Sequence, residues 1–244
     1  MGHLISLPDD RKNAVLGALE AAGCTAEEFL SIERDPEITK RVYAATLPLG
    51  MSTEAQVSRA IRWYRLYAGI QLTTEAVMAV LPEREPQFDR LSLMAPGMTP
   101  NKCYDALGRQ FGVEAIWRSI DDLDSAIVSV RKTDALYAVW FRDRREADED
   151  NSNRPASSFK QEECQTLEER LVHDGLYFQE HQRHLDEVKV TLCAGSRDCR
   201  SGDVPSVRFV PAYRQVGVNT NWCGVRDHDP NLRVRSARKG KKVS

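Results

Sequence analysis

Apolar and polar side chains alternate along the last quarter of the chain, and this alternation predicts short β-strands. Val207 and Phe209 are two residues apart, and so are Val216 and Val218. Because successive side chains of a strand point to opposite faces, we expect these four to face a core and their neighbours to face water. The same signals predict strands over residues 126–130, 135–141, 188–192, 204–210, 213–219 and 232–234.

Two segments after residue 98 carry the period of an α-helix. One begins at Thr99 and stops at Gly112. The clearer pattern covers residues 166–181, where apolar side chains share one broad face and the run 168–170 (Glu-Glu-Arg) lies on the opposite, polar face. Gly175 interrupts this second helix at a cost of about 1 kcal/mol relative to Ala.

The patterns divide the chain into four parts. Residues 1–82 are expected to form a helical N-terminal region of short helices. The Pro- and Gly-containing residues 83–98 suit a connector. Residues 99–236 mix helices with strands, and residues 237–244 form a basic tail. Since helices and strands do not alternate regularly, the fold class expected is α+β. The charged and polar residues 143–158 are expected to form a mobile loop.

Composition adds few constraints. The chain has 244 residues, 41% hydrophobic and 29% charged, with a formal net charge of -2. This balance is ordinary for a globular protein and gives no global reason to bind nucleic acid or an anionic membrane. No apolar run is long enough for a membrane span, and the N-terminus lacks a secretory pattern. We therefore expect a cytoplasmic location, with surface display by another route left open.

The six cysteines are scattered, and free thiols are expected. Cys193, Cys199, Cys223 and His228 could be considered as four zinc ligands. No pair among them has the close C-x2-C spacing that usually anchors a structural zinc site. We therefore expect no metal and no other cofactor.

Two other kinds of function remain open from the residues alone. Asp143, Glu146, Asp227 and His228 could serve a metal-dependent hydrolase or nuclease. No nucleophile elbow or phosphate-binding glycine loop accompanies them. The basic residues 233–242 could contact nucleic acid together with the N-terminal helices, but no single helix concentrates Arg and Lys. Solvated charged surface is the simpler interpretation of both, so we expect neither an enzyme nor a nucleic-acid-binding protein.

A ligand-binding surface explains the C-terminal strands better. Their outward positions hold Ser, Arg, Tyr, Gly and Asn, which are the adaptable contact residues of paratopes. A codon AAC or AAT that is randomised at its adenines reaches most residue types but not Lys, Glu, Gln, Met or Trp. Between positions 198 and 231 only Gln215 and Trp222 belong to these omitted types, fewer than the overall composition suggests.

Three motifs in this region give a resemblance to a known family. They are LCAGSR at residues 192–197, SGDVP at residues 201–205 and DPNLRVR at residues 229–235. With the stretch 137–150 and the helix around residues 167–171, they resemble the variable proteins of diversity-generating retroelements, in particular a group from small uncultivated bacteria. The resemblance covers roughly residues 99–236.

The resemblance implies a C-type-lectin-like domain over residues 99–236, close in fold to formylglycine-generating enzymes. In such systems a reverse transcriptase rewrites adenine positions, and the encoded protein acquires new ligand specificity. Residues 232–235 (LRVR) replace the Ile-Gly-Phe-Arg closing strand of better-known members. The diversified, ligand-binding residues would be Asp198, Cys199, Ser206, Arg208, Val210, Ala212, Tyr213, Gly217, Asn219, Asn221, Cys223, Gly224, Arg226, Asp227, His228 and Asn231.

The function expected is non-enzymatic recognition of an unknown protein or cell-surface ligand. Formylglycine-type oxidation is not implied, because no suitable cysteine pair is present. Binding at one site would be modest, so a homo-oligomer could raise avidity. The residues expected to make the main contacts are Arg208, Tyr213, Asn219, Asn221, Arg226 and His228.

Overall fold

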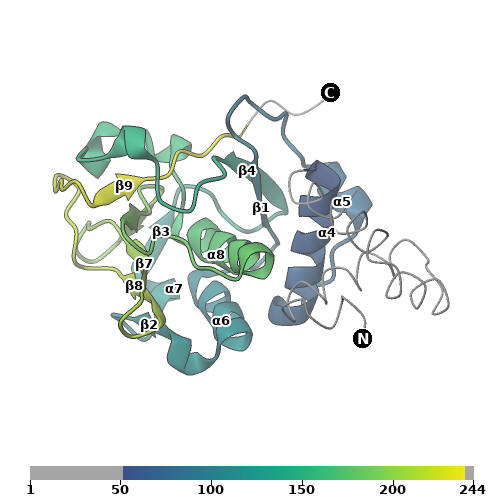
Figure 1. Cartoon of the computed structure of the whole chain (residues 1–244), viewed down its shortest axis with the longest axis horizontal. Coiled ribbons are helices and arrows are strands. Elements are labelled where there is room, and N and C mark those ends of the chain that lie inside the picture. The colour runs from purple at the N-terminus through teal and green to yellow at the C-terminus, as the bar shows by residue number, and fades with distance from the viewer. Residues whose placement is uncertain (1–51, 240–244) are drawn as a thin grey trace, which may run out of the picture. The chain divides into compact units, whose positions relative to one another are not determined.

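The computed structural model describes residues 52–239. By its internal contacts the chain divides into Met1–Gln56 and Val57–Ser244, and the second unit contains all the strands given below. This unit combines helices with mixed sheets, so the expected α+β class is confirmed (Figure 1). The helices expected within residues 1–51, and the tail residues 240–244, lie outside the described residues.

The helices begin where capping residues stand. The α-helices of the described part are α4 (Thr53–Trp63), α5 (Thr74–Met78), α6 (Pro100–Phe111), α7 (Leu123–Ala126) and α8 (Leu167–His181). The Thr99 hydroxyl caps α6, and Thr166 with Glu169 forms a capping box at the start of α8. The two helices expected after residue 98 are therefore confirmed. Across residues 52–239, no helix has the length and apolar character needed to cross a bilayer.

A five-stranded mixed sheet has the order β2-β8-β7-β5-β9. Its strands are β2 (Ile116–Arg118), β5 (Val190–Leu192), β7 (Ser206–Val210), β8 (Gln215–Asn219) and β9 (Leu232–Val234). Two smaller sheets pair β1 (Arg90–Met94) with β4 (Tyr137–Phe141), and β3 (Ile127–Ser129) with β6 (Ser196–Asp198). All six strands expected from the alternation are present, whereas β1, β2 and β6 were not expected.

The inner face of the five-stranded sheet packs on the main core. Val207, Val216 and Val218 are at most 1% exposed, as the alternation predicted. They belong to one apolar cluster with Leu107 of α6 and Leu171 of α8. In Figure 1, α8 runs through the middle of this unit, and it contacts α6, β1 and β7.

The outer face of the same sheet is covered over one half. There β5 and β9 contribute apolar side chains to a second core together with Ala156, Cys164 and Cys223. Over β2, β8 and β7 the outer face is open, and Trp117 of β2 is 47% exposed there. One sheet face is thus divided into a packed half and a free half.

The expectation that residues 168–170 of α8 form a polar, solvent-facing side of the helix is wrong. Glu168 is 6% exposed, and Glu169 and Arg170 are 0% exposed. The Glu169 carboxylate pairs with Arg131 at 2.5 Å, and Arg170 pairs with Asp186 at 2.8 Å. The helix is therefore buried on every side from Leu167 to Tyr177. Glu169 and Arg170 have charged partners from other elements, and Glu168 accepts a hydrogen bond from the Ser129 hydroxyl.

Two segments expected to be irregular contain packed structure. Residues 83–98 include strand β1, which is buried at every position. Residues 143–158 include short 3-10 helices, with Asp148 and Asn151 buried. The Asn151 side-chain amide donates a hydrogen bond to the Val234 carbonyl at 2.9 Å. Both segments therefore contribute to the domain interior.

The basic C-terminal residues are packed against the domain as far as residue 238. The expectation of a solvated basic tail is therefore wrong for this part. Arg235 is 1% exposed and Ala237 is 2% exposed. The backbone of Arg238 exchanges two hydrogen bonds of 2.9 Å with Trp140 of β4, and its side chain lies 3.9 Å from the Glu163 carboxylate. Arg235 and Arg238 are therefore engaged within the protein and are poorly placed to bind phosphate.

Candidate ligand-binding surface

The open half of the outer sheet face forms a concave surface, which we call the sheet groove. Its volume is about 480 Å³. The residues that line it are Trp117, Val190, Ser206, Arg208, Val210, Tyr213, Gln215, Gly217, Asn219 and Trp222. They come from β2, β5, β7, β8 and the segments that follow β7 and β8, so the groove exists only when these strands are assembled.

Strand register explains why these side chains gather. Trp117 of β2 lies opposite Gly217 of β8, which lies opposite Arg208 of β7. Ser206 and Asn219 are also paired, two positions along the same strands. Because paired residues point to the same face, both rows project outward while the valines between them project inward.

Gly217 keeps the floor of the groove low. A Cβ atom at this position would lie 3.6 Å from Cε3 of Trp117, at ordinary van der Waals contact. The indole of Trp117 therefore extends over the glycine, and a longer side chain at residue 217 would occupy the space beside it. Trp117 and Arg208 then flank an open floor.

Aromatic side chains stand at the margins of the groove. Tyr213 is 74% exposed, Trp222 is 58% exposed and Trp117 is 47% exposed. Tyr213 lies in a tight turn between β7 and β8, in which its N–H donates to the Val210 carbonyl at 3.1 Å. Arg214 closes the turn with a φ of 54°, in the left-handed region. This turn holds Tyr213 outside the core.

A buried ionic network supports β7 from the inner side. The Asp186 carboxylate lies 2.8 Å from Arg170 and 2.7 Å from Arg235, and none of these side chains is more than 1% exposed. The Thr191 hydroxyl donates to the same carboxylate at 2.5 Å. The Asp186 carbonyl accepts the backbone N–H of Phe209 at 3.0 Å. The middle of β7 is thereby fixed to a rigid support.

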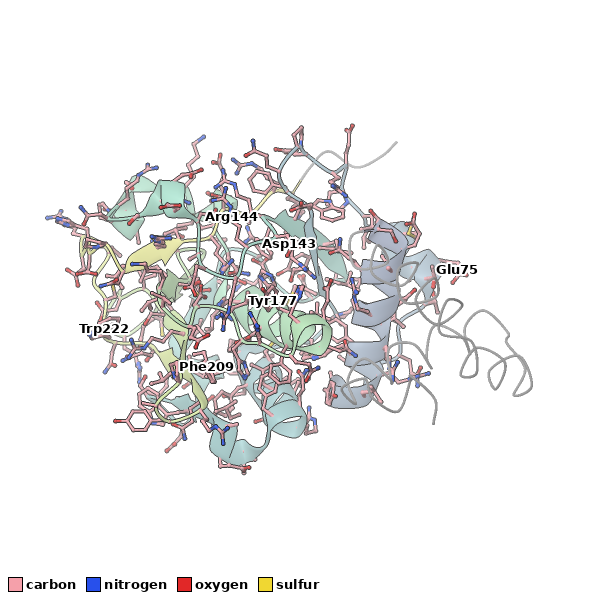
Figure 2. The ribbon with its side chains drawn as sticks, in the orientation of Figure 1. Glu75, Asp143, Arg144, Tyr177, Phe209 and Trp222 are labelled. Atoms are coloured by element: carbon pink, nitrogen blue, oxygen red, sulfur yellow. The ribbon has the colours of Figure 1, made fainter. Side chains whose placement is uncertain are left out.

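Phe209 connects this support to α8. Its ring stacks on His184 with centroids 4.3 Å apart and planes 14° apart. Nδ1 of His184 lies 3.4 Å from the Asp174 carboxylate, which also lies 3.2 Å from Arg170. Figure 2 labels Phe209 at the sheet and Trp222 at the outer edge. The inner face of β7 is tightly held, whereas its outer face is free to carry different side chains.

The groove brings together part of the residue set expected from the sequence. The expected residues that line it are Ser206, Arg208, Val210, Tyr213, Gly217 and Asn219. Ala212 and Asn221 are exposed and adjoin the groove residues Tyr213 and Trp222 in the chain.

The other expected residues lie outside the groove. Gly224, Arg226, Asp227, His228 and Asn231 belong to the exposed loop between β8 and β9. In this loop the Gly224 N–H donates to the Asp227 carboxylate at 2.8 Å. Trp222, near the start of this loop, lines the groove, whereas these five residues do not.

Three further expected residues also lie outside the groove, and two of these are buried. Asp198 is 1% exposed, because it is in β6 and pairs with Arg200 at 2.6 Å. Cys223 is 1% exposed in the second core. Cys199 is exposed, and its Sγ lies 3.4 Å from the Ser125 carbonyl. Asp198 and Cys223 were expected to bind ligand, but their burial leaves them inaccessible to a ligand in this structure.

Sequence reasoning missed four lining residues. Trp117 and Val190 belong to β2 and β5, and nothing local to these short segments shows that they border β8 and β7. Gln215 and Trp222 lie within the segment considered but are not types that adenine randomisation produces. The alternation that placed Gly217 outward is the signal that could have included Gln215.

The residues considered for metal-dependent chemistry are occupied elsewhere. Asp143 lies 2.6 Å from Arg90. Glu146 accepts the backbone N–H groups of residues 187–189 at 2.8 to 3.2 Å. Asp227 and His228 are exposed on the β8–β9 loop. Figure 2 shows Asp143 beside α8 and well apart from Trp222. No group of three or more His, Cys, Asp or Glu side chains within the described residues is arranged to hold a metal ion.

The thiols have the character of packed side chains. Cys103, Cys164, Cys193 and Cys223 are buried and free. Burial raises the pKa of Cys223 to about 11, which keeps its thiol protonated at neutral pH. These cysteines fit a structural role in the two cores.

Comparison of the chain with protein-family models, with curated proteins and with solved structures finds no match. The function must therefore be argued from the groove itself.

Proposed function

We propose that the protein is a non-enzymatic ligand-binding protein that uses the sheet groove, and that the outward groove residues differ among gene copies. It would be a variable protein of a diversity-generating retroelement, with a C-type-lectin-like domain over residues 99–236. The observation that carries this proposal is the separation of the two faces of β7 and β8. The inward residues Val207, Val216 and Val218 are buried in one core, whereas the outward residues line an open groove, with Ser206 almost fully buried at its floor.

This separation makes the outward side chains dispensable for folding. Arg208 and Tyr213 are exposed, and Asn219 is half-buried, so their replacement removes little buried apolar area. Exposed substitutions away from special features usually change stability by less than about 0.5 kcal/mol. A binding surface of this kind can change its specificity while its scaffold stays the same.

Two matched libraries test the proposal. The first randomises Arg208, Tyr213, Asn219 and Asn221 together, and most clones are expected to unfold cooperatively near the melting temperature of the parent. Clones selected from it on unrelated protein targets are expected to bind those targets. Loss of folding in most of these clones would contradict the proposal, because it would assign the outward residues to the core.

The second library is the control and randomises the inward residues Val207, Val216 and Val218. Most of its clones are expected to be unfolded, since replacements at these buried positions leave a cavity, overfill the core or bury a polar group. The surrounding DNA gives a separate test. A reverse-transcriptase gene beside an adenine-rich near-copy of the 3′ end of this gene is expected, and two diverged copies should differ at the outward codons.

A further inference from the structure

We propose that this copy of the sheet groove binds a protein segment that presents a carboxylate beside an apolar side chain, with Arg208 as the anchor for the carboxylate. The inference rests on the proposed function and names the chemistry of the ligand.

The groove has a single charged side chain, and this charge is positive. Arg208 is the one ionisable cation among the lining residues, and none of them is an Asp or Glu. Within residues 52–239 its guanidinium has no ion pair or hydrogen bond, whereas Arg131, Arg170 and Arg235 all have carboxylate partners. A guanidinium offers a planar set of donors that matches a carboxylate. The complementary ligand group is therefore an anion.

Arg208 has an apolar neighbourhood on the open sheet face. Across strands β7, β8 and β2, Arg208 and Trp117 are separated by Gly217 alone. Two strand spacings put their Cα atoms about 10 Å apart, which leaves room for one inserted side chain between the guanidinium and the indole. An apolar group that packs on Trp117 and Gly217 would exclude water from the ion pair and strengthen it.

The residue types at the margin indicate that the occupant is a protein. Trp, Tyr and Arg are the types most enriched among the energetically dominant residues of protein interfaces. Here Trp117, Trp222, Tyr213 and Arg208 all border one open groove. The expected ligand is thus a segment with an Asp or Glu next to an aliphatic or aromatic residue.

Selection from a phage-displayed library of random peptides tests this inference. Peptides enriched on the protein are expected to share an acidic residue adjacent to an apolar one. A synthetic peptide of the enriched sequence should bind about 10- to 100-fold more weakly when its acidic residue is replaced by the amide, and the Arg208→Gln variant should lose affinity to the same extent. The two changes together should cost little more than either alone.

Arg84→Gln is the matched control, because Arg84 is exposed, does not line the groove and is not among the expected ligand-binding residues. It should leave peptide affinity unchanged, and melting temperatures should be equal for all variants. If the enriched peptides lack acidic residues but fail to bind the Gly217→Leu variant, Arg208 is not a carboxylate anchor. That result would overturn this inference but would still support the proposed function. Enriched peptides that bind Gly217→Leu as well as the parent would overturn both. A concentration-dependent dimer that Gly217→Leu disrupts would assign the groove to a second copy of the chain and overturn this inference.

Discussion

Arg235 and Asp186 form an ion pair of 2.7 Å in which neither side chain is more than 1% exposed. Arg235 follows β9, and Asp186 lies between α8 and β5. Asp186 adopts a φ of 55°, so its backbone is held in a conformation that few residues adopt. Arg170 of α8 reaches the same carboxylate. Three distant segments are thereby joined beneath the strand that carries Arg208.

Replacing Asp186 by Asn should strongly destabilise the fold. Asn tolerates the left-handed backbone but removes the negative charge, which leaves Arg170 and Arg235 buried without their shared partner. We expect a loss of about 3 to 5 kcal/mol in the free energy of unfolding, measured by urea denaturation. Asp227→Asn, on the exposed loop, should change it by less than about 0.5 kcal/mol. Equal stability of the two variants would refute a central role for the network.

The glycines of α6 and α8 should respond differently to alanine. A Cβ at Gly175 would lie 2.7 Å from Nε1 of Trp63 and 2.8 Å from Oε1 of Gln110, and Trp63 is 0% exposed. We expect Gly175→Ala to destabilise by about 1 to 3 kcal/mol, despite its better helix propensity. A Cβ at Gly108 would meet the end of the Ile116 side chain at 3.0 Å, which can move. Gly108→Ala should therefore be close to neutral. Stabilisation by Gly175→Ala in thermal melts would show that the close contact is absent.

The stability of the protein should fall in mildly acidic solution because of His173. Its ring is fully buried and stacks on Phe141 at 5.3 Å. Burial, and then the neighbouring Arg235 and Arg90, lower the pKa of His173 well below its usual 6.5. The unfolded chain thus binds the proton more tightly, so this contribution is complete above about pH 6.5 and is lost as the pH falls below it.

Urea denaturation between pH 8 and pH 5 measures this effect. His173→Gln, which does not titrate, should flatten the dependence by at most about 1.4 kcal/mol per pH unit. His228→Gln, at an exposed site, should leave the profile as in the parent. Some dependence should persist in His173→Gln, because burial also lowers the pKa of His181. An unchanged profile in His173→Gln would rule out His173 as the source.

Tryptophan fluorescence should distinguish the core from the groove. Trp63 and Trp140 are at most 1% exposed, whereas Trp117 and Trp222 are 47% and 58% exposed. In the double variant Trp117→Phe and Trp222→Phe, iodide quenching should nearly disappear and the emission maximum should shift to shorter wavelength. The pair Trp63→Phe and Trp140→Phe should retain quenching. Equal quenching in the two double variants would mean that the groove tryptophans are not at the surface.

The elements of this fold differ in how far they could be predicted. Strand β8 follows from its alternation, because Val216 and Val218 are buried between half-buried outward residues. In β7 the alternation is incomplete, because the outward Ser206 is also buried. The same logic fails for α8, where Glu169 and Arg170 were assigned to a solvated face. A local sequence pattern shows which residues are polar, but it does not show which residues they pair with. Glu169 and Arg170 pair with Arg131 and Asp186, which come from other elements. Strand β2, with Trp117, is too short for any period to reveal it.

The sequence alone therefore determined the α+β class, the strands of the C-terminal part and the outward orientation of Arg208, Gly217 and Asn219, because these follow from the periodicity of neighbouring residues. Only the tertiary structure decided that β2 lies beside β8 and that Trp117 faces Arg208 across Gly217. It also decided that Asp186, Arg170 and Arg235 meet beneath the sheet. These arrangements depend on contacts between distant segments, and no local spacing of residues specifies which distant charges or strands will be brought together.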